Sequence, residues 1–214
     1  MQARRIAREL ALLSLSQMPS KPERLNAQSL QDIVVAAVRT LASEARDTLE
    51  TASAELQRSN SQLLDSETRA STPDAAKEML KESIRLTQEA INRLGHTLEI
   101  PEFLQLSNQK DVRNYALEIL GRFQTDRATV DALLNQSLVD WQLNRLAGID
   151  RDLLRIAVIE MMFLGTAPEV AINEAVELAK RYSEEDGHRF INGVLRRAYE
   201  QIKGGLQAGA SQSS

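Results

Sequence analysis

Cysteine is absent from the 214-residue sequence, and only two histidines are present. These absences exclude disulfides, thiolate nucleophiles, and metal sites built from cysteine or from several histidines. Glycine (9), proline (5) and aromatic residues (4%) are also scarce, which argues against a turn-rich all-β fold. Helix-forming residues such as Ala, Leu, Glu, Arg and Gln dominate instead, so the composition predicts an all-α protein.

Long hydrophobic runs are missing as well. No apolar run reaches the 18 or so residues of a membrane span, and no signal-peptide core follows the N-terminus. We therefore expect a cytoplasmic protein with no membrane partner. The net charge of −4 is unevenly spread: residues 1–24 hold five basic and two acidic side chains, whereas residues 43–99 hold seven basic and eleven acidic ones. The N-terminus is thus the part suited to an anionic partner.

Three arginines lie in the first turns of the predicted N-terminal helix, ARRIARELALLSL. Arg4 and Arg8 are four residues apart and share a face, with Arg5 beside them. Cations at a helix N-terminus oppose the helix dipole, so the arrangement calls for a functional explanation. A guanidinium is always charged and offers paired donors to a phosphate. The alternative is a solvated basic helix end.

Residues 44–99 carry a narrow heptad pattern. Leu49, Leu56 and Leu63 are seven residues apart, as are Ile84, Ile91 and Leu98, and Leu80 and Leu94 fill the companion seam. Thr72–Pro73 starts the second helix. The pattern predicts an antiparallel helical hairpin whose apolar seams pack against each other within the chain, with a dimer zipper as the alternative.

The C-terminal half predicts a compact helical bundle. Helices are expected at 111–134 and 135–146, the second with Trp141 in the core. A buried helix at 150–164, a capping box at 166–169 and a last helix ending near 202 complete it. The Gly-, Ala-, Ser- and Gln-rich segment 204–214 predicts a disordered tail.

Two segments resemble the NusB transcription antitermination factor family. One is WQLNRLAGIDRDLLRIAVIEMMFLGTAPEVAINEAVELAKRYSEEDGHRFINGVLRRA, in which AINEAVELAK and FINGVL are highly specific; the other is the arginine-rich first helix. The resemblance implies an all-α fold of about seven helices in two three-helix sub-bundles. Residues 1–43 and 100–203 would form this RNA-binding domain, with 44–99 as an inserted antiparallel helical hairpin.

The resemblance also implies a function. NusB proteins are not enzymes and need no cofactor or metal. They bind the boxA element of nascent ribosomal RNA leaders together with a small-subunit ribosomal protein, NusE, and help RNA polymerase with its other Nus factors to resist termination. Some members dimerise. The family's RNA-flanking positions fall on seven residues of this chain: Arg4, Arg5, Arg8, Asp150, Asp186, Arg189 and Phe190.

The sequence allows more than one interpretation of several of these residues. Phe190 either stacks on an unpaired base or packs in the core, and Asp186 and Asp150 either accept hydrogen bonds from bases or serve the fold. Ser16 stands where many family members have a tyrosine. Two other functions compete with RNA adaptor activity: a protein-interaction scaffold working through the 44–99 arm, and an accessory module for ribosomal RNA modification. The second is disfavoured because no glycine-rich cofactor loop or catalytic cysteine is present.

Overall fold

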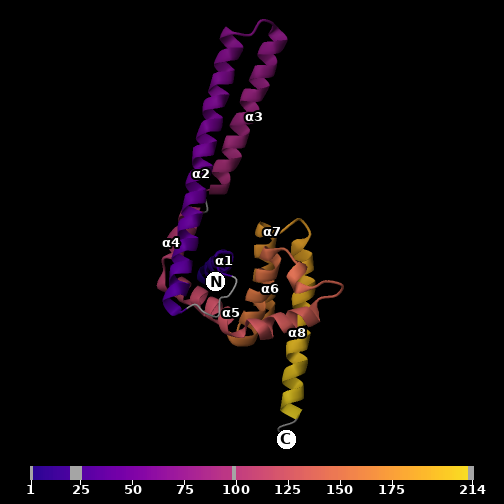
Figure 1. Ribbon diagram of the computed structural model, residues 1–214. Helices are drawn as coiled ribbons and strands as arrows, with labels where there is room; N and C mark the ends of the chain where they lie inside the picture. The colour runs from indigo at the N-terminus through magenta and orange to yellow at the C-terminus, as the bar shows by residue number, and fades with distance from the viewer. Residues whose placement is uncertain (1, 20–25, 98–99, 212–214) are drawn as a thin grey trace. The chain divides into compact units, whose positions relative to one another are not determined.

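The computed structural model describes residues 2–19, 26–97 and 100–211, and these are helical apart from their connections (Figure 1). The helices are α1 (Gln2–Leu15), α2 (Ala27–Thr68), α3 (Pro73–Thr97), α4 (Ile100–Ser107), α5 (Lys110–Ser137), α6 (Gly148–Phe163), α7 (Pro168–Tyr182) and α8 (Gly187–Ser211), with a short 3-10 turn η2 (Leu143–Arg145). The predicted all-α fold class is confirmed.

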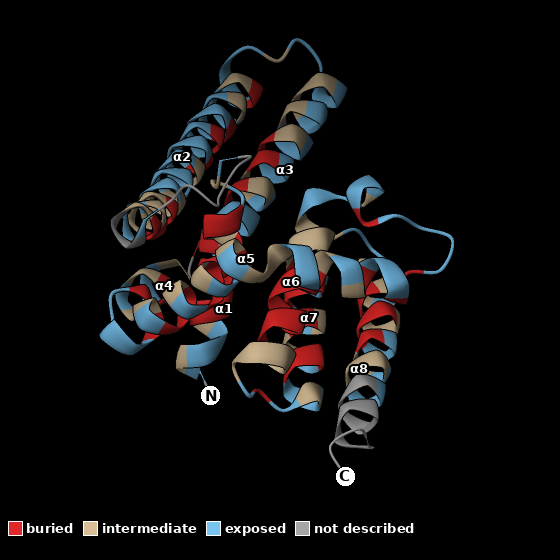
Figure 2. Ribbon diagram, turned by 60° about the horizontal axis from the view of Figure 1, so that its bottom comes forward, coloured by how far each residue is buried: buried red, intermediate tan, exposed pale blue. Residues whose placement is uncertain are grey.

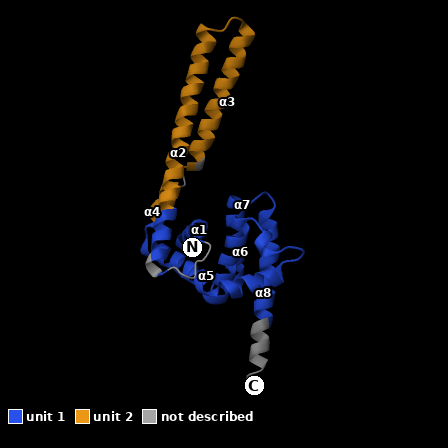
Figure 3. Ribbon diagram, in the orientation of Figure 1, with its two compact units in different colours: residues 1–37, 107–214 blue, residues 38–106 orange. Residues whose placement is uncertain are grey.

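The chain divides into two compact units (Figure 3). Unit 1 comprises residues 1–37 and 107–214, and unit 2 comprises residues 38–106. Unit 2 begins six residues before and ends seven residues after the segment 44–99 that was expected as an insertion. α2 belongs to both units, because its first turns lie in unit 1 and the rest in unit 2.

Unit 1 is organised around α6. All eight residues from Leu153 to Glu160 are buried, and this helix packs against α1, α5, α7 and α8. Figure 2 shows buried residues along α6 and α7 and on α8, and α5 contributes nine more. The near-continuous apolar sequence of α6 follows from its contacts on every side, as expected for the predicted core helix.

A buried polar cluster lies inside this core. Glu160, only 1% exposed, accepts two hydrogen bonds from Arg8 Nε at 2.8 and 2.9 Å. Tyr115 also donates its hydroxyl hydrogen to Glu160, and the Thr166 hydroxyl lies 3.1 Å from that of Tyr115. The cluster joins α1, α5, α6 and the start of the loop before α7. It satisfies a buried charge, which is otherwise costly.

Side chains cap the starts of α2 and α3, whereas α7 starts without the predicted capping box. Asn26 Oδ1 accepts from the backbone N–H of Ser29 at 2.8 Å, and Thr72 Oγ1 accepts from that of Ala75 at 3.2 Å, so these side chains cap α2 and α3. The predicted helix start at Thr72–Pro73 is confirmed. The capping box predicted at 166–169 does not form: Ala167 is the N-cap residue, with no side-chain bond. Thr166 instead turns its hydroxyl toward the Tyr115–Glu160 cluster.

Two further predictions in the C-terminal half were wrong. No helix spans 135–146: α5 ends at Ser137, and an irregular segment leads to η2. Trp141 is therefore not a core residue but 56% exposed. In addition, α8 continues to Ser211, past the point at 204 where a disordered tail was expected to begin. Residues 212–214 lie outside the described part of the chain.

The hairpin of unit 2 has a different seam from the predicted one. α2 and α3 contact each other through Ala52, Ser59, Ser83, Leu86 and Ala90, which are all buried. The predicted leucine and isoleucine heptads are instead exposed by 36–59%; Leu98 lies outside the described residues. Small residues let the two backbones approach closely, and hydroxyl hydrogen bonds replace apolar interdigitation.

The buried ion pair of unit 1 predicts a specific stability difference. Arg8→Ala leaves Glu160 without its compensating charge and should lower the free energy of unfolding by about 3–5 kcal/mol. Arg5→Ala, one turn away and exposed, should change it by no more than about 0.5 kcal/mol. Chemical denaturation followed by fluorescence of Trp141, the one tryptophan, reports on unit 1. Equal effects of the two substitutions would contradict this role of Arg8.

Candidate RNA-binding surface

Arg4 and Arg5 point outward from α1. Both are exposed. The guanidinium carbon of Arg4 lies 4.7 Å from the centre of the Tyr115 ring, a cation–π contact that orients its planar head. The pKa of Glu177 on α7 is lowered mainly by the hydrogen bond from Lys180. The positive charge of Arg5 lowers this pKa further, so Arg5 lies near α7. These two arginines therefore remain available to a phosphate-bearing ligand.

Arg8 differs from the other two arginines because it faces the core. Its side chain is 3% exposed, and besides Glu160 it approaches Glu174 at 3.4 Å. Burial by itself lowers the pKa of Arg8, but the hydrogen bond and charge of Glu160 outweigh it and the pKa is raised overall. The shared-face argument for Arg4 and Arg8 missed this, because Arg8 also adjoins the apolar positions Ala7 and Ala11, both fully buried.

A second group of predicted residues gathers where α6 and α8 begin. Asp150, in the first turn of α6, accepts a hydrogen bond from Ser183 Oγ at 2.5 Å. The backbone N–H of Gly187 bonds to the carbonyl of Glu184 at 2.8 Å and closes the turn before α8. A side chain at Gly187 would not fit, because its Cβ would lie 1.9 Å from Ser183 Oγ. Asp150 thus positions the turn before α8 through its hydrogen bond with Ser183.

Asp186 and Arg189 lie on the outer side of this turn. They form an ion pair at 3.3 Å, with side chains 82% and 79% exposed. The backbone carbonyl of Asp186 accepts the N–H of Arg189 at 3.1 Å, so Asp186 precedes the first turn of α8. An ion pair this exposed contributes little to stability. Both side chains are therefore free to exchange their mutual contact for contacts with a ligand.

An aromatic pair lies beside the turn. The rings of Trp141 and Phe190 meet edge to face, with centroids 6.4 Å apart and an interplanar angle of 68°. Phe190 is half-buried and Trp141 is 56% exposed. A hollow of about 500 Å³ next to Trp141 is lined by Asp140, Trp141, Gln142 and Arg145. Trp141 was predicted to lie in the core, although both of its neighbours in the sequence, Asp140 and Gln142, are polar.

The backbone before Trp141 is in an uncommon conformation. Asp140 has φ 60°, in the left-handed region, which Asp tolerates better than most residues. Outliers of this kind cluster at ligand sites. The conformation keeps Val139 and Trp141 outside, with exposures of 58% and 56%. The only signal in the sequence is the Asp next to Trp141.

Contacts along α7 connect the two groups. Glu9 of α1 accepts a hydrogen bond from the Tyr182 hydroxyl and forms an ion pair with Arg181 at 3.0 Å. The next residue, Ser183, binds Asp150. One continuous series of contacts therefore runs from α1 to the turn before α8, within unit 1. These contacts fix the position of the arginines of α1 relative to the aromatic rings beside the turn before α8.

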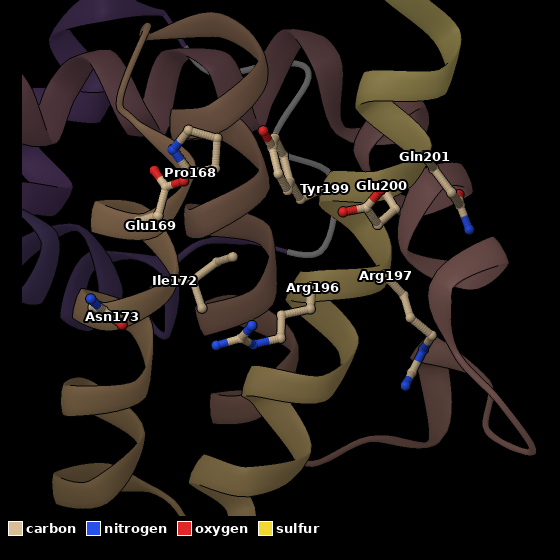
Figure 4. Close-up of a pocket in the computed structure, with 9 residues that line it drawn as sticks. All are labelled: Pro168, Glu169, Ile172, Asn173, Arg196, Arg197, Tyr199, Glu200 and Gln201. Atoms are coloured by element: carbon tan, nitrogen blue, oxygen red, sulfur yellow. The ribbon is translucent and has the colours of Figure 1, made fainter.

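A larger hollow lies between α7 and α8, further along α8 (Figure 4). Its volume is about 730 Å³. Two of its lining residues are acidic, Glu169 and Glu200, and two are basic, Arg196 and Arg197. Arg197 already donates to the carbonyl of Ser137 at 2.7 Å. Because its charges balance, this hollow favours an RNA strand less than the arginine end of α1 does.

The described residues form neither a metal site nor a membrane span. No group of three or more His, Asp or Glu side chains there is placed to hold a metal ion. No helix among them is long and apolar enough to cross a membrane.

The geometry of the turn predicts opposite effects for two glycine substitutions in α8. Gly187→Ala must displace Ser183 and disturb its bond to Asp150, so it should destabilise unit 1 by about 1–3 kcal/mol. Gly193→Ala meets only the flexible end of Arg197, at 3.7 Å, and should stabilise by about 0.5–1 kcal/mol because alanine is the better helix former. Denaturation curves compare them. Stabilisation by both would show that the turn yields easily.

Comparisons with known proteins identify the family of the chain. The model of the NusB family matches residues 67–200. Proteins named transcription antitermination protein NusB are 56% identical in Crocosphaera subtropica (94% of this chain, 97% of that protein), 54% in Microcystis aeruginosa (99% and 98%) and 58% in Nostoc punctiforme (92% and 95%). A solved structure of T. maritima NusB is 30% identical, with a TM-score of 0.42, covering 51% of this chain and 81% of that one. The family match and the curated relatives show that the chain belongs to the NusB family.

Proposed function

We propose that this chain is a non-catalytic RNA-binding adaptor in transcription antitermination. Its ligand is boxA-like single-stranded RNA of nascent ribosomal RNA leaders, bound together with the small-subunit ribosomal protein NusE. The proposal is supported above all by one observation: unit 1 carries exposed arginines on α1 and an exposed aromatic ring, Trp141, which contacts Phe190. The name shared by its relatives supports the process.

Phosphates of the RNA would bind at the N-terminal end of α1. Arg4 and Arg5 are exposed, and a guanidinium presents two parallel donors to phosphate oxygens. The stacked position of Arg4 on Tyr115 reduces the side-chain entropy that is lost on binding. Arg8 supports this end of α1 from inside the core and does not contact the RNA.

Bases would bind at the other end of the surface. Single-stranded RNA is recognised by stacking unpaired bases on aromatic rings and by hydrogen bonds to their edges. Trp141 offers the exposed ring, and Phe190 supports it edge to face. Asp186 can accept a hydrogen bond from a base amino group, and Arg189 and Arg145 carry positive charge on either side. Asp150 acts indirectly, through Ser183.

The ribosomal protein would complete the RNA surface. If both ligands bind the same folded unit and each favours the other, linkage requires the two affinities to rise by the same factor. The transcribing RNA polymerase with its other Nus factors would then receive an assembled complex. No bond is made or broken by this chain.

A titration tests the proposal directly. The full chain is titrated with a boxA-containing leader fragment and with a scrambled RNA of equal length, with and without the ribosomal protein. We expect tighter binding to boxA and a further gain with the partner. Equal binding to both RNAs, unaffected by the partner, would refute the adaptor function.

The arginine contacts predict a change in salt dependence. Arg4→Ala/Arg5→Ala should weaken RNA binding and reduce the slope of log affinity against log salt by about 1.4, since single-stranded RNA releases about 0.7 counterion per phosphate contact. Arg58→Ala/Arg69→Ala removes two exposed charges from unit 2 and serves as the control. An equal loss in both variants would mean that only overall charge matters.

The aromatic contact predicts a loss that salt does not affect. Trp141→Ala should cost about 1–3 kcal/mol of RNA affinity, the usual range for one stacked base, with an unchanged salt slope. Trp141→Phe should restore part of it. Val139→Ala removes an equally exposed residue of the same segment and should have little effect. If Val139→Ala costs as much as Trp141→Ala, stacking is not the cause.

A further inference from the structure

The register of the unit 2 hairpin is fixed by polar contacts across its seam. The Ser59 hydroxyl lies 2.9 Å from that of Ser83 and 2.8 Å from that of Thr87. Nearer the base, Arg93 Nε donates to both oxygens of Glu55, at 2.9 and 3.0 Å. Residue 59 is therefore level with about residue 85, and Leu56 with about residue 88, in this antiparallel pair.

The large apolar residues of the hairpin all lie on one side of it. The seam of α2 follows residues 48, 52, 55, 59 and 62, and that of α3 follows 79, 83, 86, 90 and 93. Each large apolar residue comes directly after a seam position. In an antiparallel pair of right-handed helices, such positions fall on the same side of both helices. This apolar face comprises Leu49, Leu56, Leu63, Leu80, Ile84, Ile91 and Leu94.

The other side of the hairpin is strongly charged. Arg85 pairs with Glu82 at 2.5 Å and also with Glu89. Arg85, and to a smaller extent Arg58 from α2, lower the pKa of Glu82, so both helices contribute to this charged side. The apolar face carries no charge between Leu49 and Leu63 or between Leu80 and Leu94. A hairpin with one charged and one apolar side is built to bind along the apolar one.

We infer that the apolar face binds the same face of a second copy of this chain, with the two hairpins antiparallel. In a twofold interface, if residue i of one copy contacts residue j of the other, then j also contacts i, so the antiparallel pattern must be symmetric about its centre. Leu49 and Leu63 are symmetric about Leu56, and Leu80 and Leu94 about residue 87. Because Leu56 is level with about residue 88, the two centres nearly coincide.

Charges at the two ends of the apolar face fit this orientation. Arg46 lies one position after the seam near the base of α2, and Glu67 occupies the equivalent place near its tip. Their midpoint also falls between residues 56 and 57. In the antiparallel dimer, Arg46 of each copy lies opposite Glu67 of the other, which gives two ion pairs. A parallel twofold arrangement would place α2 of one copy on α3 of the other and separate Leu56 from its symmetry mate, so a thiol at position 56 distinguishes the two orientations.

The available area is sufficient for a dimer. From Arg46 to Glu67 the face is about 32 Å long at 1.5 Å per residue, and two helices about 10 Å wide make it about 20 Å broad. That is on the order of 600 Å² in projection per copy, and the accessible area of a ridged surface exceeds its projection. A standard stable interface buries about 800 Å² per partner.

Sedimentation of the full chain tests the inference. We expect a species of about twice the 23.9 kDa chain mass at micromolar concentration. Leu56→Lys/Ile91→Lys places four charges in the interface and should raise the dissociation constant at least about 100-fold, with an unchanged helical circular dichroism spectrum. Leu64→Lys changes an equally exposed leucine (51%) on the outer edge of α2 and should leave the dimer intact.

Two further variants test the orientation. Arg46→Glu should weaken the dimer, and adding Glu67→Arg should restore it. The chain has no cysteine, so Leu56→Cys provides a single thiol at the symmetry centre, which should form an intermolecular disulfide on mild oxidation, whereas Leu64→Cys should not. A monomeric wild-type chain, or a dimer that survives Leu56→Lys/Ile91→Lys, would overturn the inference. Neither result affects the RNA surface, which lies in unit 1.

Discussion

The core of unit 1 depends on a buried charge that had to be neutralised. Glu160 lies in the middle of four packed helices at 1% exposure, where an unpaired carboxylate would be prohibitively costly. Arg8 supplies the opposite charge, and Tyr115 and Thr166 supply further hydrogen bonds. Because these partners come from α1, α5 and the loop before α7, satisfying one carboxylate fixes the rotation of α1 about its axis.

That rotation determines what α1 shows to solvent. With Arg8 in the core, Arg5 lies on a different face of α1 and is exposed. Arg4 lies one turn before Arg8, at the exposed start of the helix, and Glu9 reaches the end of α7. From there the contacts continue through Ser183 to Asp150 and the turn before α8. A structural ion pair in the core thus positions the arginines at one end of the proposed RNA surface, and a tight glycine turn positions Phe190 at the other.

Sequence reasoning succeeded where local chemistry decides and failed where packing does. The helix predicted to start at Thr72–Pro73 does so, and Thr72 caps it, since a cap depends only on its own turn. The all-α fold and the family followed from composition and specific motifs. Arg8 and Trp141 were misplaced because burial depends on neighbours distant in sequence. The hairpin failed for a different reason: the leucine heptads are real, but serines and alanines form the seam, which leaves the leucines outside.

The claim that RNA binds unit 1 along one continuous surface is tested most directly by hydrogen–deuterium exchange of the full chain, with and without boxA RNA. The account predicts new protection at the start of α1, around Trp141 and across the turn 183–190, with no change in residues 44–97. Protection confined to the hairpin, with α1 and the turn unaffected, would contradict it.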